Sequence, residues 1–213
     1  MNKKGQVTIF VIVAVIIVVL AVGGYYFRDS LFASSSNPAT VGAENYVKTC
    51  LKNATQEAVF AIGQQGGYFD TPAGANNFSV LASPYYMIGS ENLVPKKEVV
   101  ESELSKYVKF SLDRCLGDFS SLKQTGISVK AGVSKVTTTL FNDRVDFALN
   151  LPITVSQGDK SFVLSNFKSE VAPVRIPIIL AASSEIVASE LKNTKSICSN
   201  CIDSIAEKYK LNV

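Results

Sequence analysis

The residues of this chain that are best suited to chemistry are its four cysteines, Cys50, Cys115, Cys198 and Cys201. A cysteine can act as a nucleophile, ligate zinc, exchange electrons or form a disulfide. The chain has no histidine, which excludes Ser-His-Asp and Cys-His catalysis and histidine ligation of zinc or haem. The cysteines must therefore act with one another or with other residue types.

Four cysteines in an oxidising compartment allow two disulfides, in three connectivities. Cys50 and Cys115 each lie on the apolar face of a predicted helix, and two such helices can pack as a pair. We therefore prefer the pairing Cys50–Cys115, which leaves Cys198 with Cys201. A Cys50–Cys115 bridge closes a long loop and contributes about 4 kcal/mol in the chain-entropy model. Two buried free cysteines are the alternative.

Cys198-Ser199-Asn200-Cys201 forms a C-x-x-C motif. Such a motif can be a redox dithiol or half of a four-cysteine zinc site, which needs Cys50 and Cys115 to converge on it. A thioredoxin-like motif belongs to a βαβ unit, whereas this one follows a predicted helix. A local structural disulfide is our preferred interpretation, and we expect no metal and no cofactor.

No other motif of the chain indicates catalysis. Gln64-Gln65-Gly66-Gly67-Tyr68 lacks the lysine of a phosphate-binding loop and follows a helix, so we interpret it as a helix end. Serine and lysine are plentiful, but no spacing singles out a Ser-Lys pair. We therefore expect no catalytic residues and a protein that is not an enzyme.

Two glycosylation sequons become relevant if the domain lies outside the cell. Asn77-Phe78-Ser79 falls in a stretch of loop composition, and Asn53-Ala54-Thr55 falls within a predicted helix. Asn77 is the better candidate because an acceptor asparagine is usually found in a surface loop, and Asn53 is the second.

A run of 21 residues without a charge, residues 7–27, stands near the N-terminus. A helix of about 20 residues spans a hydrocarbon core of about 30 Å, so this run predicts a single transmembrane helix whose partner is the lipid bilayer. Lys3 and Lys4 precede it, while Arg28 and Asp29 cancel one another after it. The positive-inside rule then keeps residues 1–6 in the cytoplasm and places the C-terminal domain outside the cell membrane.

The flanking residues leave three interpretations of this run open. A cleaved secretory signal has a shorter apolar core, of roughly 7–15 residues, and a small-residue cleavage site. A signal anchor keeps the whole run. The third interpretation depends on Lys3-Lys4-Gly5-Gln6 ahead of the apolar run, which resembles the class III signal of archaeal type IV pilin-like proteins. That resemblance implies cleavage between Gly5 and Gln6 and a helix that packs into a filament core.

The resemblance to pilin-like proteins covers about 25 residues. That family usually has a glutamate at the fifth position of the mature chain, and this chain has Phe10 there. The remainder of the chain also resembles a family. Cys50-Leu51 on a helix, followed by Gln64-Gln65-Gly66-Gly67-Tyr68, is similar to uncharacterised single-span membrane proteins of small-genome archaea. This second resemblance covers most of residues 40–213 and bears on location and fold.

Helical patterns fill the first half of the external part. Residues 28–40 have linker composition, and the domain is expected over residues 41–213. Apolar residues recur every three or four positions over residues 41–64, and Gly66-Gly67 ends that helix. A second helix follows Pro95, with its acidic residues early and its basic residues late, and ends at Gly117. Short strands over residues 78–82 and 85–88 are expected to form a hairpin.

From Ile127 the apolar period becomes two. Residues 145–155 alternate over eleven positions, and strands are also predicted at residues 127–131 and 162–167. Pro152 cannot donate to a neighbouring strand, so this strand is expected to be an edge near its end or to bend there. Helices are predicted over residues 176–193 and 200–209. Two helices, an antiparallel meander and further helices indicate an α+β domain.

Charge is balanced outside the predicted membrane segment. Lys3, Lys4 and Arg28 supply the whole excess of +3, so the remaining 18 basic residues equal the 18 acidic ones. A neutral domain has no general attraction for nucleic acid. We therefore expect a membrane-anchored extracytoplasmic protein with a structural or surface-assembly role, pilin-like in one version, which assembles with itself or with an envelope protein. The alternative is an anchored cell-envelope module that binds or senses without catalysis.

Overall fold

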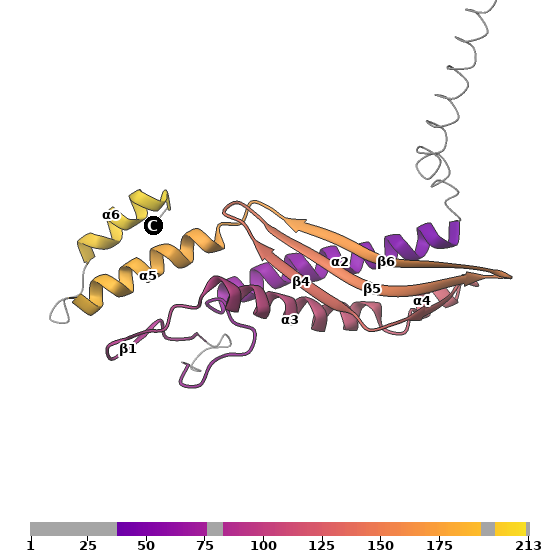
Figure 1. Cartoon of the computed structure of the whole chain (residues 1–213), viewed down its shortest axis with the longest axis horizontal. Coiled ribbons are helices and arrows are strands. Elements are labelled where there is room, and N and C mark those ends of the chain that lie inside the picture. The colour runs from indigo at the N-terminus through magenta and orange to yellow at the C-terminus, as the bar shows by residue number, and fades with distance from the viewer. Residues whose placement is uncertain (1–37, 76–82, 193–198, 212–213) are drawn as a thin grey trace, which may run out of the picture. The chain divides into compact units, whose positions relative to one another are not determined.

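The computed structural model describes residues 38–75, 83–192 and 199–211. Its helices are α2 (Pro38–Gln64), α3 (Lys97–Leu116), α4 (Ser120–Lys123), α5 (Ile176–Lys192) and α6 (Ser199–Tyr209). Its strands are β1 (Met87–Ile88), β2 (Glu91–Asn92), β3 (Ser128–Ala131), β4 (Lys135–Leu140), β5 (Val145–Gln157) and β6 (Lys160–Val171). Every strand pairing is antiparallel, and the predicted α+β class is confirmed (Figure 1). The chain divides into two compact units, Met1–Val41 and Gly42–Val213.

Helix α2 begins at Pro38, within the stretch predicted as a linker over residues 28–40. Proline suits the first turn of a helix because its missing N–H has no partner there in any case. The last three linker residues are therefore helical, which corrects the prediction. The expected helix end is confirmed: Gly66 and Gly67 have φ of 61° and 91°, and the N–H of Gly67 donates to the carbonyl of Ile62 at 2.8 Å.

Helix α3 buries one apolar residue per turn. Val100, Leu104, Val108, Leu112 and Leu116 follow one another at intervals of four and are all buried. Gly117 then ends the helix with φ of 50°. The predicted stripe had Cys115 in the last place. That assignment was wrong, because the stripe continues to Leu116 and Cys115 is exposed beside it.

The four-stranded sheet is built around β5. Strand β6 pairs with β5 along its whole length on one side. On the other side β4 pairs with residues 145–150 and β3 with residues 153–156. Strand β4 was not among the predicted strands, although Val136 and the threonines that follow it are residue types that favour strands.

Pro152 lies in the central strand, so the expectation of an edge was wrong and the expectation of a bend is nearer the observation. Leu151 and Pro152 together lie opposite the single residue Ser165, which is a β-bulge. Pro152 also falls between the ends of β3 and β4, where its carbonyl accepts the N–H of Gly132 at 2.7 Å. The proline is tolerated because no partner strand needs its N–H at this point.

Helices α2 and α3 cover one face of the sheet (Figure 1). The Thr55 hydroxyl of α2 lies 2.8 Å from the Ser169 hydroxyl of β6, and the Ser105 hydroxyl of α3 lies 2.8 Å from the Thr138 hydroxyl of β4. The core lies between these layers. Its largest fully buried side chains are Val47, Leu51, Ile62, Val100, Leu104, Val108, Leu112, Leu140, Val145, Phe147, Leu149 and Ile153.

A small hairpin connects the two helices. Strand β1 pairs with β2 across Gly89, which has φ of 59°. The predicted partner of residues 85–88 was residues 78–82, which lie outside the described residues. Among the described residues the partner is Glu91–Asn92, which comes after residues 85–88 rather than before them. Gly89 permits this tight turn because its backbone adopts positive φ without strain.

Helices α5 and α6 pack as a pair near the C-terminus. Arg175 precedes α5 and donates to the carbonyls of Tyr209 and Lys210, at 2.6 Å each, where α6 ends. Lys208 of α6 donates to a carboxylate oxygen of Glu185 in α5 at 2.7 Å. The Lys208 hydrogen bond, with a further one from Tyr209, holds the pKa of Glu185 below its ordinary value of 4.5.

The Glu185 carboxylate is expected to make stability depend on pH. Because its folded pKa is lowered, its contribution is present above pH 4.5 and is lost as pH falls through the lower folded pKa. In thermal melts, Glu185→Gln is expected to lower the midpoint slightly at pH 7, and this deficit should shrink as the pH falls below 4.5. Glu207→Gln, on the exposed side of α6, is the control and should match the wild type throughout. A deficit of Glu185→Gln that stays constant as the pH falls would contradict this.

Candidate functional site

The disulfide joins α2 to α3. Cys50 and Cys115 are bonded, with Cα atoms 5.7 Å apart, and the preferred pairing is confirmed. Cys50 is 2% exposed, whereas Cys115 is open to solvent. Tyr46 strengthens the same end of α3, because its hydroxyl donates to the carbonyl of Cys115 at 3.0 Å. The bridge thus ties the two helices together beneath the sheet.

The C-x-x-C motif is described only in part. Cys201 lies in α6 and is disulfide-bonded. Cys198 lies outside the described residues. No group of three or more cysteine, aspartate, glutamate or histidine residues suited to a metal occurs in the described part of the chain. Cys50 and Cys115 are bonded to each other rather than converging on Cys201 as thiolate ligands.

Of the two sequons, only Asn53-Ala54-Thr55 lies among the described residues. Asn53 has an exposed side chain on α2. Thr55 of the same sequon is fully buried, and its hydroxyl donates to the carbonyl of Lys52 at 2.9 Å and contacts Ser169. Thr55 therefore has a structural role that does not depend on glycosylation. Asn77 lies outside the described residues.

The N-terminal predictions also fall outside the described residues. They comprise the cleavage site at Gly5 and Gln6, the cytoplasmic residues 1–6, and the apolar run 7–27. Among residues 38–75, 83–192 and 199–211, none of the helices combines the length and apolarity that a membrane crossing needs.

The outer face of the sheet holds a hollow, and we call it the outer hollow. Three rows of side chains cross β4, β5 and β6 there, as the strand register shows. They are Thr139, Asp146 and Glu170; Thr137, Ala148 and Lys168; and Lys135, Asn150 and Asn166. The central position is Ala148, whose short side chain forms the floor. Two overlapping cavities of about 430 Å³ each share Thr137, Ala148 and Lys168.

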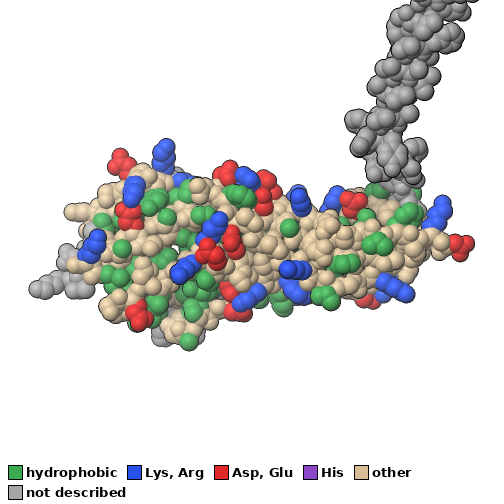
Figure 2. Space-filling view, in the orientation of Figure 1, with side chains coloured by type: hydrophobic (Ala, Val, Ile, Leu, Met, Phe, Trp, Pro, Cys, Tyr) green, Lys and Arg blue, Asp and Glu red, His purple; other side chains and the backbone are tan. Residues whose placement is uncertain are grey.

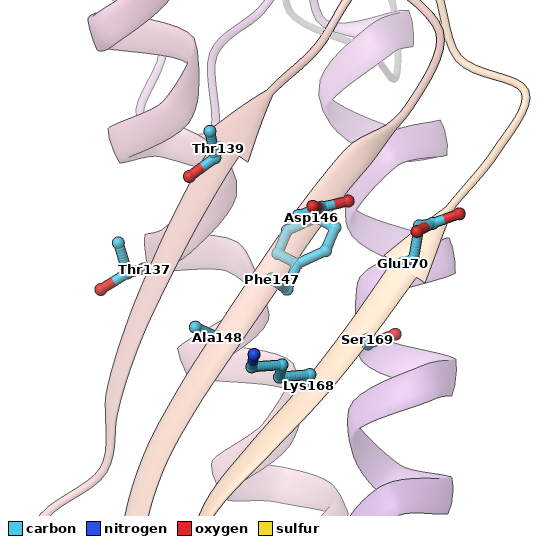
Figure 3. Close-up of a pocket in the computed structure, with 8 residues that line it drawn as sticks. All are labelled: Thr137, Thr139, Asp146, Phe147, Ala148, Lys168, Ser169 and Glu170. Atoms are coloured by element: carbon cyan, nitrogen blue, oxygen red, sulfur yellow. The ribbon is translucent and has the colours of Figure 1, made fainter.

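Charges in the outer hollow are arranged unevenly. Arg144 lies 3.1 Å from Asp146 and 3.7 Å from Glu170, so one guanidinium is shared between the two carboxylates of the first row and offsets only part of their charge. Its guanidinium also lies 4.3 Å from the centre of the Phe141 ring. In the described part of the chain, Lys135 and Lys168 take part in no ion pair. Figure 3 shows the Lys168 side chain reaching from β6 toward Ala148. The hollow thus presents two ammonium groups among hydroxyl and amide groups.

A buried carboxylate organises the loop after α2. Glu103 of α3 is 6% exposed, and its Oε2 accepts the backbone N–H groups of Phe69 and Asp70 at 3.0 and 2.8 Å. Lys106 donates to Oε1 at 2.7 Å, and also to Asp70 at 2.9 Å. These hydrogen bonds, with Glu103 first, raise the pKa of Lys106. From the sequence, Glu103 was expected only as one of the acidic residues early in the helix, because the sequence does not distinguish a buried glutamate from an exposed one.

An exposed apolar surface lies on the β1–β2 hairpin and α5. Its members are Tyr85, Met87, Ile88, Leu93 and Ile179, which are between 37% and 50% exposed. Asn92 of β2 lies 3.4 Å from Ser184 of α5, so the hairpin and the helix are neighbours. Figure 2 shows hydrophobic side chains gathered in this region. We call these five exposed residues of the hairpin region and α5 the assembly surface, in which the consecutive strand residues Met87 and Ile88 project to opposite faces of the hairpin. Sequence analysis did not find it, since it depends on which apolar residues the core leaves uncovered.

Comparison of the chain with protein-family models, with curated proteins and with solved structures found no match.

Proposed function

We propose that this chain is a membrane-anchored protein whose extracytoplasmic domain has a structural or surface-assembly role. The charge-free run 7–27, preceded by Lys3 and Lys4, supports the anchor and its orientation. The Cys50–Cys115 disulfide supports an external domain, because disulfides persist in oxidising compartments. The chain has no histidine, and its described residues hold no metal-binding group. We propose that the protein is not an enzyme.

The observation that carries the assembly role is the assembly surface. A two-stranded hairpin is marginally stable in isolation, yet both residues of β1, Met87 and Ile88, are exposed. Grouped apolar side chains in water commonly mark contact sites between proteins. Covering them would both stabilise the hairpin and join two molecules. We propose that a second copy of this chain covers the assembly surface.

The finer version of this proposal is a pilin-like subunit. Lys3-Lys4-Gly5-Gln6 supports it, because cleavage after Gly5 would leave the apolar helix at the new N-terminus. The first test is the intact mass of the chain extracted from its native membrane. Loss of residues 1–5 is the expected result for a filament subunit, and the full-length mass is expected for a signal anchor. Release of the protein by a salt wash without detergent would contradict membrane anchoring in either form.

Self-assembly is tested by a pair of charged substitutions. Met87→Lys with Ile88→Lys in the full chain is expected to weaken self-association at least tenfold, since a lysine buried in an apolar contact loses about 1.4 kcal/mol or more. The measurement is chemical cross-linking of the chain in its membrane, followed over protein concentration. Val133→Lys is the control, because Val133 is 86% exposed between β3 and β4, away from the hairpin.

Equal cross-linking of the wild type and the double variant would contradict a role for the assembly surface. A loss in the Val133→Lys control as well would show that added charge alone disrupts association.

The second candidate function is an anchored module that binds or senses a ligand in the cell envelope. The outer hollow favours it, because about 430 Å³ lies within the usual size range of small-molecule sites. The two functions use different surfaces of the domain, and one chain can serve both.

A further inference from the structure

We propose that the outer hollow binds an anionic oligosaccharide that carries carboxylate groups. The proposal goes beyond assembly, since it concerns the opposite sheet face from α2 and α3 and uses none of the residues of the assembly surface.

The shape comes from one small residue. Ala148 stands at the centre of a three-by-three set of outward side chains, and all of its neighbours on β4 and β6 are longer. None of the described helices lies over this face (Figure 1), and Thr137, Ala148 and Lys168 are exposed. The residues around Ala148 therefore form a rim above a methyl floor. A ligand seated there contacts three strands at once.

The charge of one end of the hollow favours an anionic ligand. At the other end the single cation Arg144 offsets only part of the charge of Asp146 and Glu170. The cavity that Lys135 and Lys168 line has no carboxylate in its lining, and neither lysine has an ion-pair partner among the described residues. A carboxylate that reaches either ammonium group gains a charge-assisted hydrogen bond, which is stronger than a neutral one. The two lysines stand on β4 and β6, two strand spacings or about 10 Å apart. A ligand whose carboxylates are spaced at a similar distance can meet both lysines at once.

The neutral groups suit a ligand with many hydroxyls. Thr137 and Thr139 supply hydroxyl groups, and the amides of Asn150 and Asn166 lie side by side, joined by a hydrogen bond of 2.9 Å. Each of these groups can donate and accept at the same time, as sugar hydroxyls do. Single-stranded nucleic acid is disfavoured because it needs rings to stack on, and Phe147 and Phe167 are only 2% and 4% exposed. A peptide strand is disfavoured because β5 already pairs on both sides.

The experiment measures binding of trigalacturonate to the full chain by isothermal titration calorimetry. Binding is expected for the wild type, and maltotriose, which lacks carboxylates, is expected to bind at least tenfold more weakly. Lys168→Gln should weaken trigalacturonate binding at least tenfold, and raising the salt concentration should weaken it too. Ala148→Leu, which fills the floor, should abolish it.

Two controls keep the test specific. The control for Ala148→Leu is Thr154→Leu, which places a leucine on the same face of β5 but beyond the hollow. The control for Lys168→Gln is Lys160→Gln, which removes an exposed lysine at the far end of β6. Both control variants should bind trigalacturonate like the wild type. Thermal melts should show Ala148→Leu folded, since Ala148 is exposed. Absence of binding to the wild type, or binding that Ala148→Leu and Lys168→Gln leave intact, would overturn the proposal. Equal binding of triglutamate would overturn the saccharide as the occupant.

This outcome is separable from that of the assembly test. The variant with Met87→Lys and Ile88→Lys is expected to bind trigalacturonate with unchanged affinity, because the assembly surface and the outer hollow share no residue. If that variant loses self-association and retains binding, both proposals stand. Loss of binding in that variant would overturn the separation of the two surfaces.

Discussion

Replacement of Cys50 by alanine together with Cys115 by serine is expected to lower the free energy of unfolding by about 4 kcal/mol. The bridge spans 65 residues of sequence and therefore restricts the unfolded chain strongly. Alanine suits the buried Cys50 position, and serine suits the exposed Cys115 position, so the substitutions themselves add little strain. Urea denaturation of the full chain without reductant measures the difference.

The second cysteine pair supplies the control for this result. If Cys198 and Cys201 form the local bridge that we expect, replacing both by serine removes a very short loop and costs only about 2 kcal/mol. Reductant added to the wild type should reproduce most of the loss seen in the Cys50 and Cys115 variant, because Cys115 is accessible to solvent. A variant as stable as the wild type would show that the bridge contributes no stability.

Replacement of Glu103 by alanine is expected to cost about 3 kcal/mol, the second large effect in this protein. The substitution leaves the backbone N–H groups of Phe69 and Asp70 without their acceptor and removes the partner of Lys106. Glu103→Gln should cost less, about 1–2 kcal/mol, since the amide oxygen can still accept hydrogen bonds while the charge is lost.

Glu98→Ala is the matched control for Glu103→Ala. Glu98 is an exposed glutamate in the first turn of the same helix, so its loss is expected to change stability by no more than about 0.5 kcal/mol. Amide hydrogen exchange at Phe69 and Asp70 should accelerate in Glu103→Ala and stay unchanged in Glu98→Ala. Equal stability of the two variants would contradict the role assigned to the buried carboxylate.

Local apolar periodicity predicted the helices α2 and α3 well, because glycine or proline residues mark where each helix begins or ends. The three- and four-residue apolar period of α2 ends at Gly66-Gly67, and that of α3 lies between Pro95 and Gly117. The alternation in β5 is unbroken from Val145 to Val155, even across Pro152. In these segments the burial pattern and the backbone preference of the end residues agree, so the sequence alone was sufficient.

Which strands pair with one another was harder to predict from the sequence. Pro152 suggested an edge because proline lacks an N–H, yet the strand is central and the gap between β3 and β4 accommodates the proline. The expected hairpin partner of residues 85–88, residues 78–82, lies outside the described residues. The described partner of Met87 and Ile88 is Glu91–Asn92, which local sequence did not indicate. Register and partner choice depend on residues that are distant in sequence.

By itself, the sequence determined the α+β class, the C-terminal ends of α2 and α3, the preferred disulfide, the charge balance and the absence of histidine chemistry. These follow from local periodicity and composition, which do not need the rest of the chain to be in place. Only the tertiary structure decided that Glu103 is buried against two backbone N–H groups, that Ala148 stands among longer neighbours, and that Met87 and Ile88 remain uncovered. Burial and hollows are properties of packed elements, because the same residue is core or surface according to what lies across from it.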